Sequence, residues 1–299
     1  MIHAHLIVNP AAGRGAAGRA ADRVARAFRG QGWVVDLCRT EHPGHASELA
    51  RAAARAGVPH VIAVGGDGTV HEVANGLLAS PDGSRPALGV VPIGSGDDFA
   101  KLVGTYRLAP EAAVARIVTA TPRRFDVGRC LGEYFVNSLG CGFGAAVVRT
   151  RNAMSGLHGF LSYLVPIVRT FATFRPPHFE VAAAEHRERG PMMMVEVCNG
   201  TTAGGSYRFA PEADPADGRL DVCVIRKVSL LRFLIALPRV MRGTHLGMRE
   251  FALFRTTRVT VRSLDGPLIL HLDGELRAPG VDECVVEVVP GCLPVLVAG

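Results

Sequence analysis

The chain has 299 residues, 48% of them hydrophobic and 20% charged, and its 33 Lys and Arg against 27 Asp and Glu leave a net charge of +6. This length suits about two domains, and the composition excludes a disordered, collagen-like or coiled-coil protein. The basic balance favours anionic partners such as nucleotides, anionic lipid surfaces or nucleic acid, without choosing among them.

Seven cysteines lie far apart with no C-x-x-C pair, and the eleven histidines show no metal-ligand spacing. This pattern argues against a disulfide framework and a zinc finger, so we expect free thiols in a reducing cytoplasm. The N-terminal residues do not resemble a signal peptide, and no stretch approaches the ~20 apolar residues of a membrane helix. We therefore expect a cytoplasmic protein whose contact with the inner membrane face, if any, is peripheral.

Short apolar runs typical of buried strands alternate with helical apolar spacing over the first 120 residues. The predicted strands are residues 6–8, 33–37, 60–64 and 87–91. The predicted helical faces are residues 17–28, 46–54, 70–78 and 110–120. Strands alternating with helices of this length predict parallel crossovers and an open α/β sheet.

From about residue 123 the apolar period changes to two. The predicted strands are 124–129, 134–139, 179–183, 192–198, 220–225, 259–262, 268–272 and 284–289, the first two paired around Gly132. Helical insertions near 159–174 and 230–241 interrupt them. Period-2 segments joined by turn residues favour a β-sandwich-like second domain.

Residues Gly13 to Gly18 spell G-x-G-x-x-G between a strand and a helix, and Asp36 ends the second predicted strand. A dinucleotide-binding fold has this pattern, so an NAD(P)-dependent oxidoreductase is one candidate. Four residues, Asn9 to Ala12, separate the strand from the first glycine, whereas the dinucleotide turn is tight. We therefore favour a loop followed by a helix N-terminus at this position.

Gly65-Gly66-Asp67-Gly68-Thr69 follows the third predicted strand and is the stronger signal. Glycines allow main-chain N–H groups to approach an anion closely, and the helix that follows directs its positive end to the same point. An acidic residue there would repel phosphate unless a cation lies between them, so Asp67 indicates a metal ion bound with the phosphates.

Three N-terminal segments occur in a fixed order: Asn9-Pro10-Ala11-Ala12-Gly13, Gly65 to Thr69, and Pro92 to Ala100. Three later segments follow: Phe125-Asp126-Val127-Gly128, Asp214 to Asp221, and Leu272-Asp273-Gly274-Glu275. Together they resemble the diacylglycerol kinase/sphingosine kinase catalytic family, most closely its soluble bacterial lipid kinases, over nearly the whole chain. The P-loop pattern G-x-x-x-x-G-K-[ST] does not occur.

The resemblance implies a two-domain kinase. Its parts would be an α/β ATP-binding domain at 1–123, a β-sandwich-like lipid-substrate domain at 124–288, and a C-terminal segment at 289–299 that returns to the first domain. The residues expected at the nucleotide are Asn9, Pro10, Ala11, Ala12, Gly13, Thr40, Gly65, Gly66, Asp67, Gly68, Thr69, Val70, His71 and Ser95.

The resemblance also implies that Glu275 is the general base that takes the proton from a lipid hydroxyl, with Asp126 close by. It further implies a structural Mg²⁺ held by the Asp217 carboxylate and by backbone oxygens at Asp214 and Arg219. Oxygen donors in a glycine-containing loop suit this hard cation. A plain Asp-Gly turn before the next strand explains the loop equally well.

Two residues depart from the family pattern. Ser95 stands where Thr is usual and keeps the hydroxyl group, whereas Asp97 stands where Asn is usual and places a second acid beside Asp98. An extra negative charge near a triphosphate is unfavourable unless a metal binds it or it turns away. We expect altered ATP affinity or metal dependence without loss of activity.

The segment 230–241 has one apolar helical face flanked by basic residues. Such a helix either lies on an anionic bilayer or packs on the sandwich, and the sequence leaves both interpretations open.

These observations predict a Mg²⁺-dependent kinase that transfers the γ-phosphoryl group of ATP to a hydroxyl of a lipid such as diacylglycerol. One alternative is a NAD kinase-like phosphotransferase acting on a soluble substrate; another is an oxidoreductase that uses the loop at 13–18. A third is a nucleotide- or lipid-sensing protein without activity. No nucleic-acid partner is expected, and the acceptor lipid and the oligomeric state, a homodimer included, stay open.

Overall fold

The computed structural model describes residues 2–81, 85–154, 161–278 and 280–298. They form two compact units, one of Met1–Val127 with Pro290–Gly299 and the other of Gly128–Val289. The sequence placed the domain limits at 123/124 and 288/289. Whether each unit folds as an independent domain stays a prediction.

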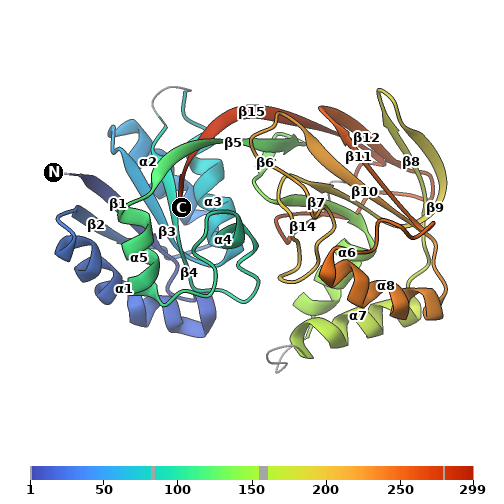
Figure 1. The fold of residues 1–299 in the computed structure, drawn as a ribbon, viewed down its shortest axis with the longest axis horizontal. Helices are drawn as coiled ribbons and strands as arrows, with labels where there is room; N and C mark the ends of the chain where they lie inside the picture. Colours follow the sequence, from blue (N-terminus) through green and yellow to red (C-terminus); the bar gives the residue numbers. More distant parts are fainter. Residues whose placement is uncertain (1, 82–84, 155–160, 279, 299) are drawn as a thin grey trace. The chain divides into compact units, whose positions relative to one another are not determined.

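The first unit contains a parallel sheet in the order β2-β1-β3-β4 (Figure 1). Its strands are β1 (His3–Val8), β2 (Val34–Arg39), β3 (His60–Gly65) and β4 (Ala87–Pro92). The far end of β15 (Glu283–Val297) adds a parallel neighbour to β4, with Val295 opposite Leu88. The open α/β sheet expected from the alternating apolar pattern is confirmed.

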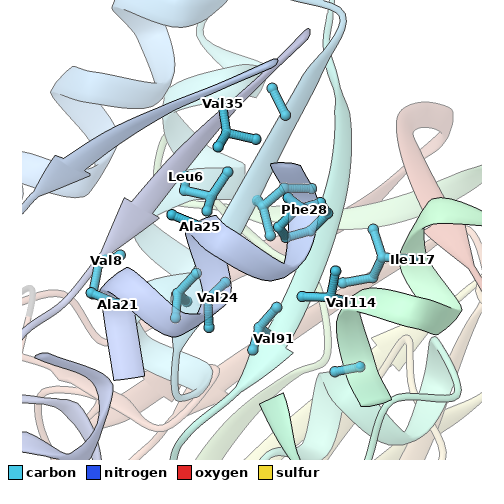
Figure 2. Packing of buried hydrophobic residues seen from close by; sticks show 14 of the residues in the cluster. Leu6, Val8, Ala21, Val24, Ala25, Phe28, Val35, Val91, Val114 and Ile117 are labelled. Atoms are coloured by element: carbon cyan, nitrogen blue, oxygen red, sulfur yellow. The ribbon is translucent and has the colours of Figure 1, made fainter. Parts of the chain in front are cut away.

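The helices α1 (Ala12–Gly30), α2 (His45–Arg55) and α3 (Asp67–Leu78) connect successive strands from β1 to β4. The helices α4 (Asp98–Leu102) and α5 (Pro110–Val118) follow β4. α1 and α5 bury their apolar stripes against one face of the sheet (Figure 2). Leu6 and Val8 of β1 meet Val24 and Phe28 of α1 in this core. The three-and-four spacing of alanines and valines in α1 therefore specifies its buried face.

Helices α2 and α3 approach closely at Gly76. A Cβ atom there would lie 2.3 Å from the Ser47 carbonyl oxygen and 2.8 Å from the Ala50 Cβ. We predict that Gly76→Ala lowers the free energy of unfolding by about 2 kcal/mol, because the backbone of α2 must move. Gly30→Ala is the matched control, since a Cβ there meets nothing within 4 Å. Urea titrations that gave both variants equal stability would contradict this packing.

The second unit is built from antiparallel strands. It contains the end of β5 (Thr121–Cys130) and the start of β15, up to Val289. Its other strands are β6 (Glu133–Phe135), β7 (Ser138–Gly142), β8 (His178–Ala183), β9 (Arg187–Cys198), β10 (Leu220–Arg226), β11 (Phe251–Thr256), β12 (Arg258–Ser263), β13 (Leu270–Leu272) and β14 (Glu275–Arg277). One series of pairs runs β14-β13-β7-β9-β10-β11, and another runs β9-β8-β12-β15. β9 belongs to both series, which enclose a core of Val, Leu and Cys side chains.

Three helices of the second unit pack together (Figure 1). They are α6 (Phe143–Asn152), α7 (Leu161–Thr173) and α8 (Leu230–Arg242). The Phe171 and Phe233 rings join α7 to α8 with centroids 4.3 Å apart, and Phe143 of α6 lies edge-on to both at 6.2 and 5.7 Å. Within the described ranges, no helix combines the length and apolar character needed to cross a bilayer.

Some predicted elements need correction. The strand expected at 134–139 is two strands, β6 and β7, because the N–H groups between them bind the Asp273 side chain instead of a neighbouring strand. The helices α4 and α6 and the strands β11 and β14 were not predicted at all. Residues 159 and 160 of the helix expected at 159–174 lie outside the described residues.

Candidate active site

Three loops leave the carboxyl ends of neighbouring parallel strands in the first unit, after β1, β3 and β4. Backbone hydrogen bonds join their starts: the Asn9 N–H donates to the Val64 carbonyl at 3.1 Å, and the Ile93 N–H donates to the Gly65 carbonyl at 2.8 Å. The carboxyl edge of an open parallel sheet is where such folds bind ligands.

The second and third loops touch backbone to backbone. A Cβ atom on Gly94 would lie 2.7 Å from the Gly66 Cα, and one on Gly65 would lie 2.4 Å from the Thr69 hydroxyl oxygen. Only glycine fits these positions, and its absent side chain lets a ligand approach main-chain N–H groups. α3 begins here, and the first N–H groups of a helix have no intrahelical partner. The loop pair therefore has a surface suited to phosphate oxygens.

The first loop makes a left-handed turn before α1 continues regularly. The φ angles are 57° at Gly13, 57° at Arg14 and 82° at Gly15. The Asn9 side-chain oxygen accepts a hydrogen bond from the Ala11 N–H at 3.1 Å and shapes the start of the loop. This conformation agrees with the loop and helix N-terminus expected at 13–18.

Asp36 does not end its strand, as the dinucleotide interpretation assumed, because β2 continues to Arg39. Its Oδ2 lies 2.8 Å from His3 Nε2 and 3.0 Å from His5 Nε2. These three side chains are close enough to share a metal ion, so the statement that the histidines lack metal-ligand spacing was wrong. Parallel strand register brings them together. A second such group consists of His42, His45 and Glu48.

The other predicted nucleotide residues differ in exposure. The Thr40 N–H donates to the Val8 carbonyl at 2.9 Å, and Ser95 is exposed on the third loop. His71 is buried at 3% exposure. The Thr69 hydroxyl is buried and has no hydrogen-bond partner among the described residues. The remaining predicted residues of the first two loops are Pro10, Ala12, Gly68 and Val70.

Asp67 and Asp98 each have a partner in α4. Asp67 Oδ1 accepts a hydrogen bond from the Phe99 N–H at 3.2 Å, which ties the second loop to α4. Asp98 is buried and pairs with Lys101 Nζ at 2.6 Å. This ion pair directly compensates the charge of Asp98, whereas the neighbouring Asp97 has no such direct cation contact among the described residues.

Asp97 has φ 50°, a left-handed conformation that Asn adopts readily. Its Oδ2 accepts a hydrogen bond from the Gly94 N–H at 3.2 Å. Burial raises the pKa of Asp97 to about 6, and the charge of Asp98 acts in the same direction, whereas the Gly94 N–H and Lys101 oppose it. The protonated carboxyl therefore stabilises the fold fully below pH ~3.8, and this stabilisation is lost as pH rises through about 6.

We predict that Asp97→Asn, neutral at every pH, exceeds the wild type in stability by about 1–2 kcal/mol at pH 7.5 and matches it near pH 4. Thermal unfolding from pH 4 to 8 tests this. Asp282→Asn is the control, since Asp282 is exposed in the second unit. A stability difference that stayed constant across this range would disprove the role of Asp97 ionisation.

In the second unit, the turn Asp273-Gly274 joins β13 to β14, with φ angles of 50° and 86°. The Asp273 carboxylate accepts three main-chain hydrogen bonds, from the N–H groups of Val136, Asn137 and Ser138 at 3.0, 2.8 and 3.0 Å. The Asp273 N–H donates in turn to the Ser138 carbonyl at 2.8 Å. These bonds clamp the turn to the linker between β6 and β7.

Glu275 is the first residue of β14 and pairs with Leu272 across the hairpin. Its side chain is exposed, so it is free to meet a substrate. Two residues on, the Arg277 guanidinium binds the Glu133 carboxylate, which raises the pKa of Arg277. This ion pair fixes β14 beside β6, and an exposed carboxylate on a fixed hairpin can act as a general base.

His271 of β13 and Glu196 of β9 form a buried pair in the same unit. His271 Nε2 lies 3.7 Å from Glu196 Oε2, and their exposures are 6% and 0%. Burial lowers the pKa of His271 to about 4, so the imidazole is neutral near pH 7 and the pair is not a salt bridge. A Cβ on Gly140 would lie 2.2 Å from Glu196 Oε2. Glycine at 140 therefore makes room for this pair.

The loop predicted to hold Mg²⁺ contains two Asx turns. Asp214 Oδ1 and Asp217 Oδ1 each accept a bond from the N–H two residues ahead, at 3.1 and 2.9 Å, the latter from Arg219. Asp221 is buried beside Arg255, with Oδ1 3.1 Å from its Nε, and burial raises the pKa of Asp221. The Asx turns agree with a plain turn, and the metal site stays a prediction.

Asp126 belongs to the first unit and is buried at 3% exposure. Its Oδ1 accepts a hydrogen bond from the Gly291 N–H at 2.7 Å, so the carboxylate ties β5 to the returning β15. A role for Asp126 beside Glu275 stays a prediction.

The sequence reasoning did not single out Asp273, Glu196 or His271. A signal existed for each: Asp273 lies in the quoted Leu-Asp-Gly-Glu segment, and His271 alternates with apolar neighbours. Glu196 is the one acidic residue in the apolar run 192–198. A lone charge in a buried strand indicates a polar partner on the neighbouring strands.

Both halves of the chain match known families. Residues 3–130 match the family described as diacylglycerol kinase catalytic domain, and residues 137–297 match the YegS C-terminal NAD kinase beta sandwich-like domain.

Individual proteins show the same likeness. The chain is 29% identical to "Diacylglycerol kinase" of Bacillus subtilis (strain 168), over 92% of this chain and 90% of that protein. It is 32% identical to "Probable lipid kinase YegS-like" of Pseudomonas putida, over 83% and 81%. A solved diacylglycerol kinase structure from Bacillus anthracis shares the fold with a TM-score of 0.71 at 20% identity, over 99% and 96%. The chain therefore belongs to the family of diacylglycerol kinase-like and YegS-like lipid kinases.

Proposed function

We propose that this protein transfers the γ-phosphoryl group of ATP to a hydroxyl group of a membrane lipid such as diacylglycerol. The observation that supports ATP most directly is the contact of the two glycine loops, where a Cβ on Gly94 would lie 2.7 Å from the Gly66 Cα. A loop pair this close, next to the start of α3, suits the oxygens of a triphosphate.

A second observation, at Thr69, also supports a nucleotide at this edge of the sheet. The Thr69 hydroxyl is buried at this edge and has no partner among the described residues, which is a cost unless a ligand or water completes it. Ser95, exposed on the third loop, offers a further hydroxyl. We assign the nucleotide contacts to Asn9–Gly13, Thr40, the Gly65–His71 segment and Ser95.

Mg²⁺ would supply positive charge that offsets the triphosphate, and Asp67 is the carboxylate we assign to it. Asp67 Oδ1 is already held by the Phe99 N–H, so the side chain has a fixed direction. Asp214, Asp217 and Arg219 form the second place assigned to Mg²⁺, with a structural role.

Glu275 is the proposed general base. A neutral alcohol attacks phosphorus poorly, and removal of its proton by a placed carboxylate typically contributes ~10²- to 10⁴-fold in rate. The clamp on Asp273 holds the turn just before Glu275, which orients the base. Asp126 is assigned the role of its neighbour in the reaction.

The test is a phosphotransfer assay with γ-labelled ATP and Mg²⁺ over a total bacterial lipid extract, with NAD as acceptor in a parallel reaction. We expect label in a lipid product, which mass spectrometry identifies as a phosphorylated alcohol. Label in NADP instead would favour the NAD kinase-like alternative, and no label in either acceptor would remove the proposal.

A further inference from the structure

The helices α6, α7 and α8 differ from the rest of the chain in charge. Acidic residues number 27 in 299, about one in eleven, yet residues 134–179 and 222–249, which include all three helices, contain none. The three helices carry six arginines: Arg149, Arg151, Arg169, Arg232, Arg239 and Arg242. We refer to α6, α7 and α8 as the acid-free helices.

One side of α8 is fully used in packing. Ala236 and Val240 are buried, and the Phe233 ring meets Phe171 of α7 and Phe143 of α6. These contacts fix how α8 is rotated about its axis. The other side of α8 therefore faces outward.

That outward side of α8 is apolar. Leu230, Leu231, Leu234 and Ile235 are 59%, 69%, 54% and 39% exposed, and Val168 on the adjoining α7 is 55% exposed. Large apolar side chains at this exposure are ordinary when scattered singly. Four of them within six residues of one helix, with no acid nearby in the sequence, form a surface that water solvates poorly.

The arginines of α8 lie beside this apolar side. Arg239 and Arg242 are exposed, and neither has an acidic partner among the residues that the structure describes. Arg232 lies 3.5 Å from Glu250 and is the one of the three that is partly neutralised. An apolar stripe bordered by unpaired cations is complementary to an anionic bilayer, which has negative headgroups above an apolar interior.

We propose that α8 is the membrane-docking element of this protein, inserting Leu230, Leu231, Leu234 and Ile235 into the interface of an anionic bilayer while Arg239 and Arg242 bind the headgroups. This inference rests on the proposed function only in taking the substrate to be a membrane lipid. It assigns a place on the fold to the contact with the membrane.

The experiment measures co-sedimentation of the intact protein with sucrose-loaded vesicles, without ATP. The vesicles are either pure phosphatidylcholine or contain about 30% phosphatidylglycerol, and the salt is varied up to roughly 0.5 M NaCl. We expect anionic vesicles to bind the wild type at least ~10-fold more tightly than neutral ones, and salt to weaken binding.

Two variants and a control separate the apolar and charged contributions. Leu231→Glu/Leu234→Glu should weaken binding to anionic vesicles by ~10-fold or more, and Arg239→Gln/Arg242→Gln should do so by about 10-fold while reducing the salt dependence. Leu131→Glu, at a leucine 50% exposed in the β5–β6 turn, should bind like the wild type. Circular dichroism checks that each variant is folded.

The outcomes distinguish this inference from the proposed function. Equal vesicle binding by the wild type and the Leu231→Glu/Leu234→Glu variant would overturn the docking role of α8. Sedimentation velocity showing a dimer that this variant dissociates would also overturn it, because a second copy would then cover the face. If vesicles bind as expected but no lipid is phosphorylated, the proposed function fails and the docking element stands. If the protein binds no vesicles but phosphorylates a short-chain, monomeric diacylglycerol, the docking role of α8 fails and the proposed function stands.

Discussion

Glu275→Gln is expected to lower kcat for lipid phosphorylation by ~10²- to 10⁴-fold and to leave ATP binding nearly unchanged. The amide cannot accept the proton of the attacking hydroxyl, yet it has the same shape as the carboxylate. Because Glu275 is exposed at the start of β14, the change should cost little stability. Steady-state kinetics with γ-labelled ATP, together with calorimetric ATP titration, measure both quantities.

Asp282→Asn is the matched control for this variant. It removes the charge of another exposed acid in the same unit without touching the hairpin, so its kcat should stay within about 2-fold of the wild type. A Glu275→Gln enzyme with wild-type turnover would remove Glu275 from the mechanism. A loss of turnover in both variants would indicate an effect of net charge instead of general-base catalysis.

Asp273→Ala should lower the free energy of unfolding by about 3 kcal/mol. The change leaves three main-chain N–H groups, of Val136, Asn137 and Ser138, without their acceptor, and it puts alanine at a φ of 50°. It should also lower kcat, because the turn before Glu275 loses its clamp. Urea denaturation and the phosphotransfer assay measure the two effects.

Asp273→Asn gives a graded comparison. An amide oxygen in place of Oδ1 still accepts from Asn137 and Ser138, whereas an NH₂ group in place of Oδ2 faces the Val136 N–H without accepting from it. We expect Asp273→Asn to lower the free energy of unfolding by about 1–2 kcal/mol, which places its stability between those of the wild type and Asp273→Ala. If the two variants were equally stable, the three hydrogen bonds would not be what the carboxylate contributes.

The N-terminal part of the chain, in which strands alternate with helices, was more predictable from the sequence than the β-rich part that follows. In α1 and α3 the three-and-four spacing and the glycine punctuation both specify the element, and local pattern agrees with the fold. β11 was missed because Phe251–Thr256 ends in Arg and Thr with no turn signal before β12. β14 has three residues, too few for any period to show, and its pairing depends on the Asp273-Gly274 turn.

The candidate site likewise has features that the sequence predicts and features that it does not. The glycine loops were predictable because close backbone contact demands glycine, which the sequence shows directly. The clamp on Asp273 could not be predicted, since its three donors lie more than 130 residues earlier in the chain. The buried Glu196 and His271 pair likewise depends on strand register across β7, β9 and β13, which local pattern does not encode.

The central claim is that the glycine loops of the first unit bind ATP with Mg²⁺, and isothermal titration of the purified protein tests it most directly. The account predicts saturable binding with a Kd below about 1 mM for the wild type. It also predicts at least ~10-fold weaker binding for folded Gly94→Ala, whose Cβ would lie 2.4 Å from Asp97 Oδ1 and 2.7 Å from the Gly66 Cα. No binding heat from the wild type, or equal affinity in the two proteins, would contradict it.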